Sequence, residues 1–198
     1  MNKIRRSLPF WLSLLLMLPA CSPPPPTDDF AYAASPFTAT IRGSYTLSDG
    51  VSRPIAATAA VGEPPTAGTP SDRDMTVTFT QPPALEGVVL SSAHQLNEEG
   101  QMVRTVTLTS PSAYGEITAS SDVGAFDGFL RFAEALLPLG DVVSVSPTAE
   151  DGTHTVTRKT SDGGWEAVYL FSSEHTLPLR ITVTMLMSGE VIELIVQP

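Results

Sequence analysis

The side chains best suited to nucleophilic or metal chemistry are few, because the 198 residues include three histidines and one cysteine. His94, His154 and His175 fall in separate predicted strands or turns, with no second ligand at a spacing typical of a metal site. The chain also has no Gly-x-Ser-x-Gly elbow and no glycine-rich loop for a phosphate. We therefore expect no metal site, no cofactor and no enzymatic activity.

The cysteine, Cys21, stands in surroundings that indicate a defined modification. A basic start, Met1–Arg6, and an apolar run, Ser7–Ala20, precede it, which is the order of an export signal. The run contains two prolines and is shorter than the about 20 apolar residues that a membrane-spanning helix needs. A single cysteine in an exported domain has no internal disulfide partner, so its thiol requires another explanation.

The sequence Leu18-Pro19-Ala20-Cys21 resembles the lipobox of bacterial lipoproteins. The resemblance implies that residues 1–20 are a signal peptide, that a lipid is attached to Cys21, and that cleavage leaves this cysteine at the N-terminus. Two or more acyl chains hold a protein stably in a bilayer. We therefore expect an extracytoplasmic protein, anchored to the bacterial cell membrane through Cys21. A plain secretory signal with a coincidental cysteine is the alternative.

A proline-rich segment follows the cysteine, and we interpret residues 21–36 as the lipidated cysteine with a flexible spacer. Eight of the 11 basic residues and all 21 acidic residues lie after Cys21, which gives the exported part a net charge of −13. Nucleic acids and anionic lipid surfaces attract basic patches, so nucleic-acid binding is not expected. Residues 37–198 are long enough for one domain with its own core.

Alternation of apolar and polar residues predicts a mainly β domain. Tight turns such as Asp49-Gly50, Asp151-Gly152 and Ser188-Gly189 separate the runs, which favours sequential antiparallel pairing. The expected strands cover residues 37–47, 55–61, 75–80, 88–92, 102–109, 115–119, 142–146, 153–159, 165–171, 179–187 and 191–196.

One segment has the period of a helix instead. Its apolar residues recur on one face, and charged residues occupy the other. The apolar stripe comprises Phe126, Phe129, Leu130, Ala133, Leu136 and Leu137. Because so short a helix is not stable alone, we expect its apolar face to pack in the concave side of a single curved antiparallel sheet, a half-barrel.

The order of these features resembles the LolA/LppX-like lipoproteins of bacterial envelopes, over about Phe37 to Pro198. The resemblance rests on the lipobox, the proline-rich spacer and the strand pattern Phe37-x-Ala39-x-Ile41. It rests also on Val77-x-Phe79-x-x-Pro82-x-x-Leu85-x-Gly87, on the single mid-chain helix and on the turn Thr176–Ile181. In that family a half-barrel wraps one or two helices, and the hollow between them takes an acyl chain, a lipid or a lipoprotein. The resemblance implies a lining of Met75, Val77, Phe79, Phe126, Phe129, Leu130, Leu137 and Met185, which Val183 and Met187 could join.

Two features depart from that family, since only one helix is evident and the chain carries its own lipid anchor. The anchor argues against shuttling between membranes but is compatible with local lipid or lipoprotein handling. The same apolar residues could equally form a filled core, because the pattern does not distinguish a pocket from packing. The alternatives are a non-catalytic structural or interaction module that meets another envelope protein, and a sensor of envelope stress.

Overall fold

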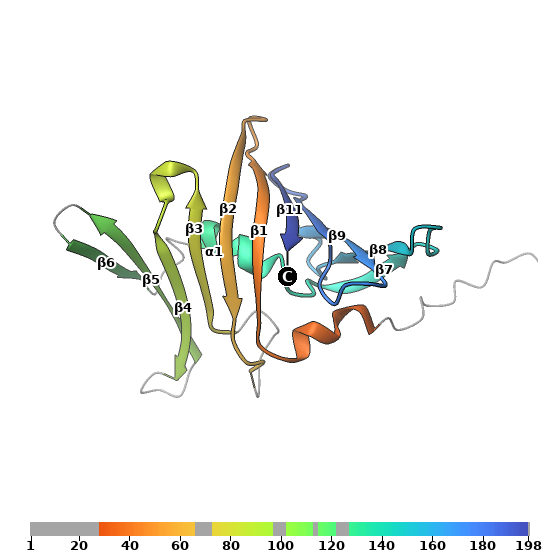
Figure 1. Ribbon diagram of the computed structural model, residues 1–198, viewed down its shortest axis with the longest axis horizontal. Helices are drawn as coiled ribbons and strands as arrows, with labels where there is room; N and C mark the ends of the chain where they lie inside the picture. Colours follow the sequence, from red (N-terminus) through yellow and green to blue (C-terminus); the bar gives the residue numbers. More distant parts are fainter. Residues whose placement is uncertain (1–27, 66–72, 97–101, 113–114, 122–126, 198) are drawn as a thin grey trace, which may run out of the picture.

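The computed structural model describes residues 28–65, 73–96, 102–112, 115–121 and 127–197. These residues form one open antiparallel sheet, two short 3₁₀ helices and one α-helix (Figure 1). The mainly β, single-sheet fold class expected from the sequence is confirmed. Among the described residues, no helix is both long enough and apolar enough to cross a membrane.

The sheet contains eleven strands, all close to the predicted ranges. Their bounds are β1 Phe37–Thr46, β2 Ser52–Val61, β3 Met75–Gln81, β4 Val89–Leu96, β5 Met102–Ser112, β6 Gly115–Ser121, β7 Asp141–Val145, β8 Thr153–Lys159, β9 Trp165–Ser172, β10 Arg180–Met185 and β11 Val191–Gln197. The helices are η1 Asp28–Ala34, η2 Pro83–Leu85 and α1 Asp127–Glu134.

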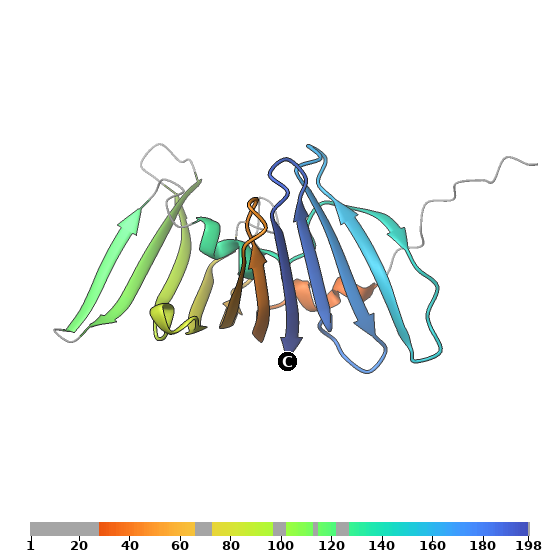
Figure 2. The ribbon, with the colours of Figure 1, turned by 90° about the horizontal axis from the view of Figure 1, so that it is seen from above.

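The first strand, β1, lies in the middle of the sheet, and the strands that follow reach the two edges in turn. Strands β1 to β6 pair in sequence out to one edge, and the segment containing α1 then leads to β7 at the opposite edge. Strands β7 to β11 return inward until β11 pairs with β1. The sheet therefore has two wings, β1–β6 and β7–β11, which Figures 1 and 2 show on either side of the β1–β11 pair.

The two wings meet at an unusually close backbone contact. Gly43 of β1 pairs with Leu194 of β11, and a Cβ atom built on Gly43 would lie 1.8 Å from the carbonyl oxygen of Glu193. Real Cβ atoms do not approach a backbone oxygen so closely, and only glycine fits. This glycine allows β1 and β11 to approach each other closely at the centre of the sheet.

The apolar core lies on the face that α1 covers. Buried residues alternate along the strands, as in β3, where Met75, Val77 and Phe79 are buried and the intervening threonines are half-buried. Strands β10 and β11 show the same alternation. In Figure 1, α1 lies behind the central strands, and the predicted position of the helix in the concave face is confirmed.

The structure corrects one strand end. Residues 179–187 were expected to form one strand with Met187 on its inner face. The chain instead turns after Met185, where the Met185 N–H donates to the Glu190 carbonyl at 2.9 Å and the Gly189 N–H donates to the Met185 carbonyl at 2.8 Å. Met187 lies at the tip of this turn with 94% of its surface exposed, so it does not line the concave face.

Candidate functional site

The candidate site is the concave face of the sheet together with the segment that covers it, residues 127–140. We call this the concave site. The described residues of the implied lining all belong to it and are between 0 and 5% exposed: Met75, Val77, Phe79, Leu130, Leu137 and Met185. Phe129 lies in α1, but its side chain is outside the described part, and Phe126 is outside the described residues altogether. These side chains belong to one continuous cluster of buried apolar residues.

The helix contributes more buried surface than the predicted stripe. Within α1, Leu130 and Ala133 are buried as expected, and Phe132 is buried as well; the helix ends at Glu134, so the buried residues Ala135, Leu136 and Leu137 lie in the turn that follows it. Phe132 makes an edge-to-face contact with Tyr45 at the end of β1, with ring centres 5.8 Å apart. A helix enclosed by a concave sheet is buried over more than one face. Helical periodicity describes a single apolar face and therefore missed Phe132, while Ala135 lies beyond the end of the helix.

The segment after α1 is fixed through its backbone. The Tyr169 hydroxyl donates to the Leu137 carbonyl at 2.6 Å and accepts from the Leu139 N–H at 3.2 Å. The Arg158 guanidinium donates to the carbonyls of Leu139, at 3.1 Å, and Gly140. Burial raises the pKa of Tyr169 above its ordinary value, so the phenol stays protonated and can donate. These bonds hold residues 137–140 on strands β8 and β9.

The folded N-terminal helix η1 adds to this hold. The Tyr32 hydroxyl donates to the Leu136 carbonyl at 2.5 Å. Phe30 packs edge-on against Tyr169 and Phe171, with ring centres 5.0 and 5.2 Å away, and the Arg158 guanidinium carbon lies 4.8 Å from the Phe30 ring centre. We refer to these contacts of η1 and β8–β9 with residues 136–140 as the clamp.

Residues 28–34 fall within the range 21–36 that the sequence predicts to be a spacer, and in the structure they form η1. They form η1 because Phe30 and Tyr32 can bury apolar rings on the core. Arg73 secures the end of η1, since its guanidinium donates to the carbonyls of Ala33, at 2.7 Å, and Ser35, at 2.9 Å. Two aromatic residues in a proline-rich, polar stretch were the sequence signal that this segment was not all spacer.

Two histidines pair with aspartates at the margin of the core. His154 Nε2 lies 3.0 Å from Asp29 Oδ1 and joins β8 to η1, while His94 Nδ1 lies 3.6 Å from Asp74 Oδ1. Within the described residues, no group of three or more His, Cys, Asp or Glu side chains is placed to hold a metal. Both pairs connect neighbouring segments of the fold.

The polar side of α1 is tied to the sheet by two ion pairs. Arg104 Nη2 of β5 lies 2.9 Å from Glu134 Oε1, and Arg104 Nε also donates to Ser92 Oγ at 2.9 Å. Arg131 Nη1 lies 3.5 Å from Glu190 Oε2, in the turn between β10 and β11. Both pairs are only partly buried, so each adds little to the free energy of unfolding.

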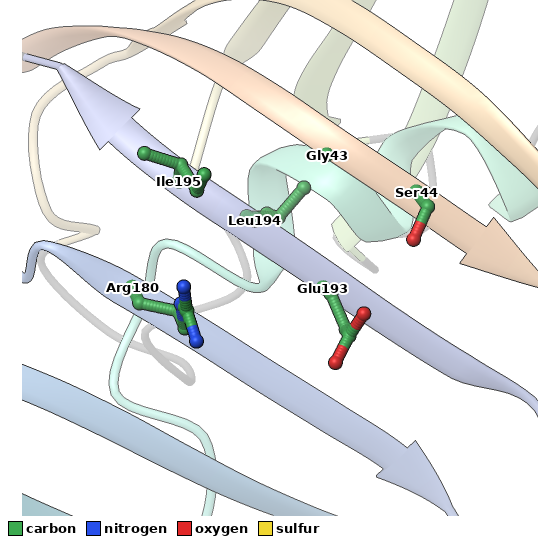
Figure 3. Close-up of a pocket in the computed structure, with 6 residues that line it drawn as sticks. All are labelled: Gly43, Ser44, Arg180, Glu193, Leu194 and Ile195. Carbon is green, nitrogen blue, oxygen red and sulfur yellow. The ribbon is translucent and has the colours of Figure 1, made fainter.

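A small pocket of about 180 Å³ opens at the β1–β11 contact. Figure 3 shows its residues on β1, β10 and β11 with α1 on the far side of the sheet. The lining residues are Gly43, Ser44, Arg180, Glu193, Leu194 and Ile195. It lies on the opposite face from the concave site, and its volume is below the few hundred Å³ of an ordinary ligand pocket.

Comparisons with known proteins give distant structural likenesses. No family model and no curated protein matches the chain. A DUF1329 family protein from Desulfovibrio piger is 12% identical with a TM-score of 0.45, over 86% of this chain and 89% of that one. An outer membrane lipoprotein-sorting protein domain from Vibrio parahaemolyticus gives 11% identity, a TM-score of 0.39, and coverage of 83% and 84%. A LolA superfamily protein from Nitrosomonas europaea is 12% identical with a TM-score of 0.38, over 86% of this chain and 90% of that one.

Proposed function

We propose that this chain is a lipid-anchored protein of the bacterial cell envelope whose concave site binds an acyl chain or a similar apolar ligand. One observation carries the proposal: the apolar concave face is covered by a helix of eight residues whose polar side is tied to the sheet by partly buried ion pairs. The segment that follows the helix is clamped through its backbone. A short cover whose polar side is held only by such ion pairs can move without unfolding the sheet.

The energies of the two states are close enough for reversible binding. Moving α1 off the sheet exposes Leu130 and Phe132, which costs about 3–6 kcal/mol at about 1.5–3 kcal/mol for each side chain. An acyl chain that buries ten methylenes in their place gains about 8 kcal/mol at about 0.8 kcal/mol each. Ordering the ligand offsets part of this gain. Binding would therefore be modest and reversible.

The anchor at Cys21 would keep this site close to the membrane that supplies such chains. Cys21 lies outside the described residues, and its lipidation rests on the lipobox resemblance. Labelled palmitate should enter the wild-type protein and should not enter Cys21→Ser. The variant should also leave the membrane fraction. A Cys21→Ser protein that still sediments with membranes would contradict the anchor.

We propose further that the site is not catalytic. Its lining is apolar, and the polar groups that enter it either fix the backbone of residues 136–140 or tie α1 to the sheet. Such groups position the cover.

The alternative, an interaction module for another envelope protein, has one observation in its favour. Three exposed apolar residues stand on turns at the end of the sheet away from η1: Val51 at 49%, Leu186 at 43% and Met187 at 94% exposure. A filled core with an apolar tip would suit a protein partner better than a lipid.

Native mass spectrometry separates the two functions. The full chain, extracted from membranes in mild detergent, should carry non-covalent lipid in addition to its anchor, and Val77→Trp should carry less because it fills the site. Repeated recovery of ligand-free protein that also fails to bind a fluorescent fatty acid would contradict the acyl-binding function. Met187→Ser should leave lipid binding unchanged and is the matched control.

A further inference from the structure

Several arginine side chains lie around the concave site, and three of them form short hydrogen bonds or ion pairs with oxygen acceptors. Arg73 donates to three backbone carbonyls, of Gly62, Ala33 and Ser35. Arg158 donates to two carbonyls in the clamp. Arg104 bonds Ser92 and Glu134, both at 2.9 Å. These three guanidiniums have structural roles.

Arg131 of α1 has much weaker partners. Within the described residues, its guanidinium donates from Nη1 to the Met185 sulfur at 3.0 Å and to Glu190 Oε2 at 3.5 Å, and it also forms a side-chain hydrogen bond with Tyr45. A thioether is a poor acceptor, and the second bond is at the limit of hydrogen-bonding distance. A third of the side chain is exposed, at 33%. The guanidinium therefore keeps donor capacity for a further acceptor.

The surroundings of Arg131 join the apolar core to solvent. Its contact Met185 is 5% exposed and belongs to the core, whereas the guanidinium carbon lies 5.8 Å from the ring centre of the half-buried Trp165. Tyr45 interacts with both Arg131 and Glu190. All these residues lie at the end of the sheet away from η1, where β1 and β10 end and β9 begins. An acyl chain in the concave site would have its head group at this rim.

We infer that Arg131 binds the anionic head group of the ligand, a carboxylate or a phosphate, while the acyl chain occupies the concave site. The inference rests on the proposed function and names its ligand class. A guanidinium presents paired N–H donors that match both anions in bidentate geometry. Glu190 holds the guanidinium weakly in the absence of ligand, and the incoming anion replaces it.

The charge of the molecule makes a dedicated cation necessary. The part of the chain after Cys21 has a net charge of −13, which repels anionic lipids in general. A neutral apolar ligand needs no arginine at the rim. An anionic one needs a specific positive group there, and Arg131 is the cation that the concave site presents next to Met185.

The test compares acids with matched neutral lipids on the full-length protein in detergent, by displacement of the neutral dye Nile red. Palmitate is set against methyl palmitate, and dioleoyl phosphatidic acid against dioleoylglycerol. Wild type should bind the preferred acid about tenfold more tightly than its neutral partner, the size expected for one charge-assisted contact. The pair that shows the preference identifies the head group as carboxylate or phosphate.

Three variants give different expected results. Arg131→Gln should abolish the preference and leave methyl palmitate binding unchanged. Glu190→Gln should increase it, because the competing carboxylate is gone. Arg180→Gln, on the opposite face and exposed, makes the same charge change and should have no effect. Thermal melts confirm that each variant is folded. If Arg131→Gln is unstable, Glu190→Gln still tests the inference, because it is expected to increase the preference for the acid rather than abolish it.

Two outcomes overturn the inference in distinguishable ways. Equal binding of acids and neutral lipids by wild type, or a preference that survives in Arg131→Gln, contradicts the head-group role and leaves the proposed function standing. No displacement by any of the four lipids overturns the proposed function together with the inference.

Discussion

The two parts of the covering segment are attached in different ways. Residues 136–140 are held by hydrogen bonds from Tyr32, Tyr169 and Arg158 to backbone groups. The helix α1 lies over β2, β3 and β4 and is held by apolar packing and by side-chain ion pairs. The Tyr169 bond is buried and costly to break, and the partly buried bonds from Tyr32 and Arg158 add to it, whereas partly exposed ion pairs contribute little. In the proposed function, the clamped part therefore serves as the hinge and α1 as the part that moves.

The largest expected effect comes from truncating a buried leucine in either part of the core. Leu130→Ala in α1 and Leu194→Ala in β11 should each lower the free energy of unfolding by about 2–5 kcal/mol, because both side chains are fully buried. Only Leu130→Ala should bind palmitate more tightly, since it leaves space between helix and sheet. Chemical denaturation and Nile red displacement measure the two quantities. Equal changes in palmitate affinity would show that the effect is not specific to the helix that covers the sheet.

Removal of a single hydroxyl tests the clamp. Tyr169→Phe leaves the Leu137 carbonyl and the Leu139 N–H without their partner, which should cost about 1–3 kcal/mol of stability. Hydrogen exchange should become faster at residues 137–140. Tyr45→Phe, a phenol at the far rim, is the control and should leave this exchange unchanged. Unchanged exchange at 137–140 in Tyr169→Phe would show that the clamp does not fix this segment.

The same phenols give the clamp a pH dependence. Burial raises the pKa of Tyr169 and of Tyr32 above their usual value, and the neighbouring Tyr169 adds to the effect on Tyr32. The unfolded chain loses these protons above about pH 10, while the folded chain keeps them. Their contribution to stability is thus constant below about pH 10 and is lost as the pH rises further. Denaturation midpoints should fall less steeply in the double variant Tyr32→Phe, Tyr169→Phe than in wild type.

The smallest effect is expected at the ion pair that ties α1 to the β10–β11 turn. Glu190→Gln should change stability by no more than about 1 kcal/mol, because the pair is partly exposed and its atoms are 3.5 Å apart. A loss as large as that of Tyr169→Phe would show that α1 is fastened as firmly as the clamp. Chemical denaturation of the two variants side by side makes the comparison.

The sequence predicted the strands well because alternation and turn residues are local signals. Met75, Val77 and Phe79 show the period of two that any half-buried strand has. The strand order could be inferred only in outline. The close approach of β1 and β11 at Gly43 could not be inferred, because it depends on the distance to Glu193 in another strand. Local pattern also ended β10 two residues late, because the hairpin is closed by backbone bonds that involve Glu190.

The clamp was the least predictable part of the site. Tyr32, Arg158 and Tyr169 are far apart in sequence and act on backbone carbonyls, which no residue pattern reveals. The apolar residues of the concave site could be placed on one face from the sequence, because they follow strand and helix periodicity. Arg131 is one of the charged residues that helical periodicity places on the polar face. Its weak partners, Met185 and Glu190, lie far away in sequence and are brought close only by the fold.

Hydrogen exchange of the full chain with and without palmitate tests the central claim, that α1 moves while its C-terminal attachment stays in place. The account predicts that amides of residues 130–134 exchange faster than those of β11 and faster still when palmitate is bound, with residues 137–140 protected in both states. Exchange at 130–134 that is as slow as in β11 and unaffected by palmitate would contradict it.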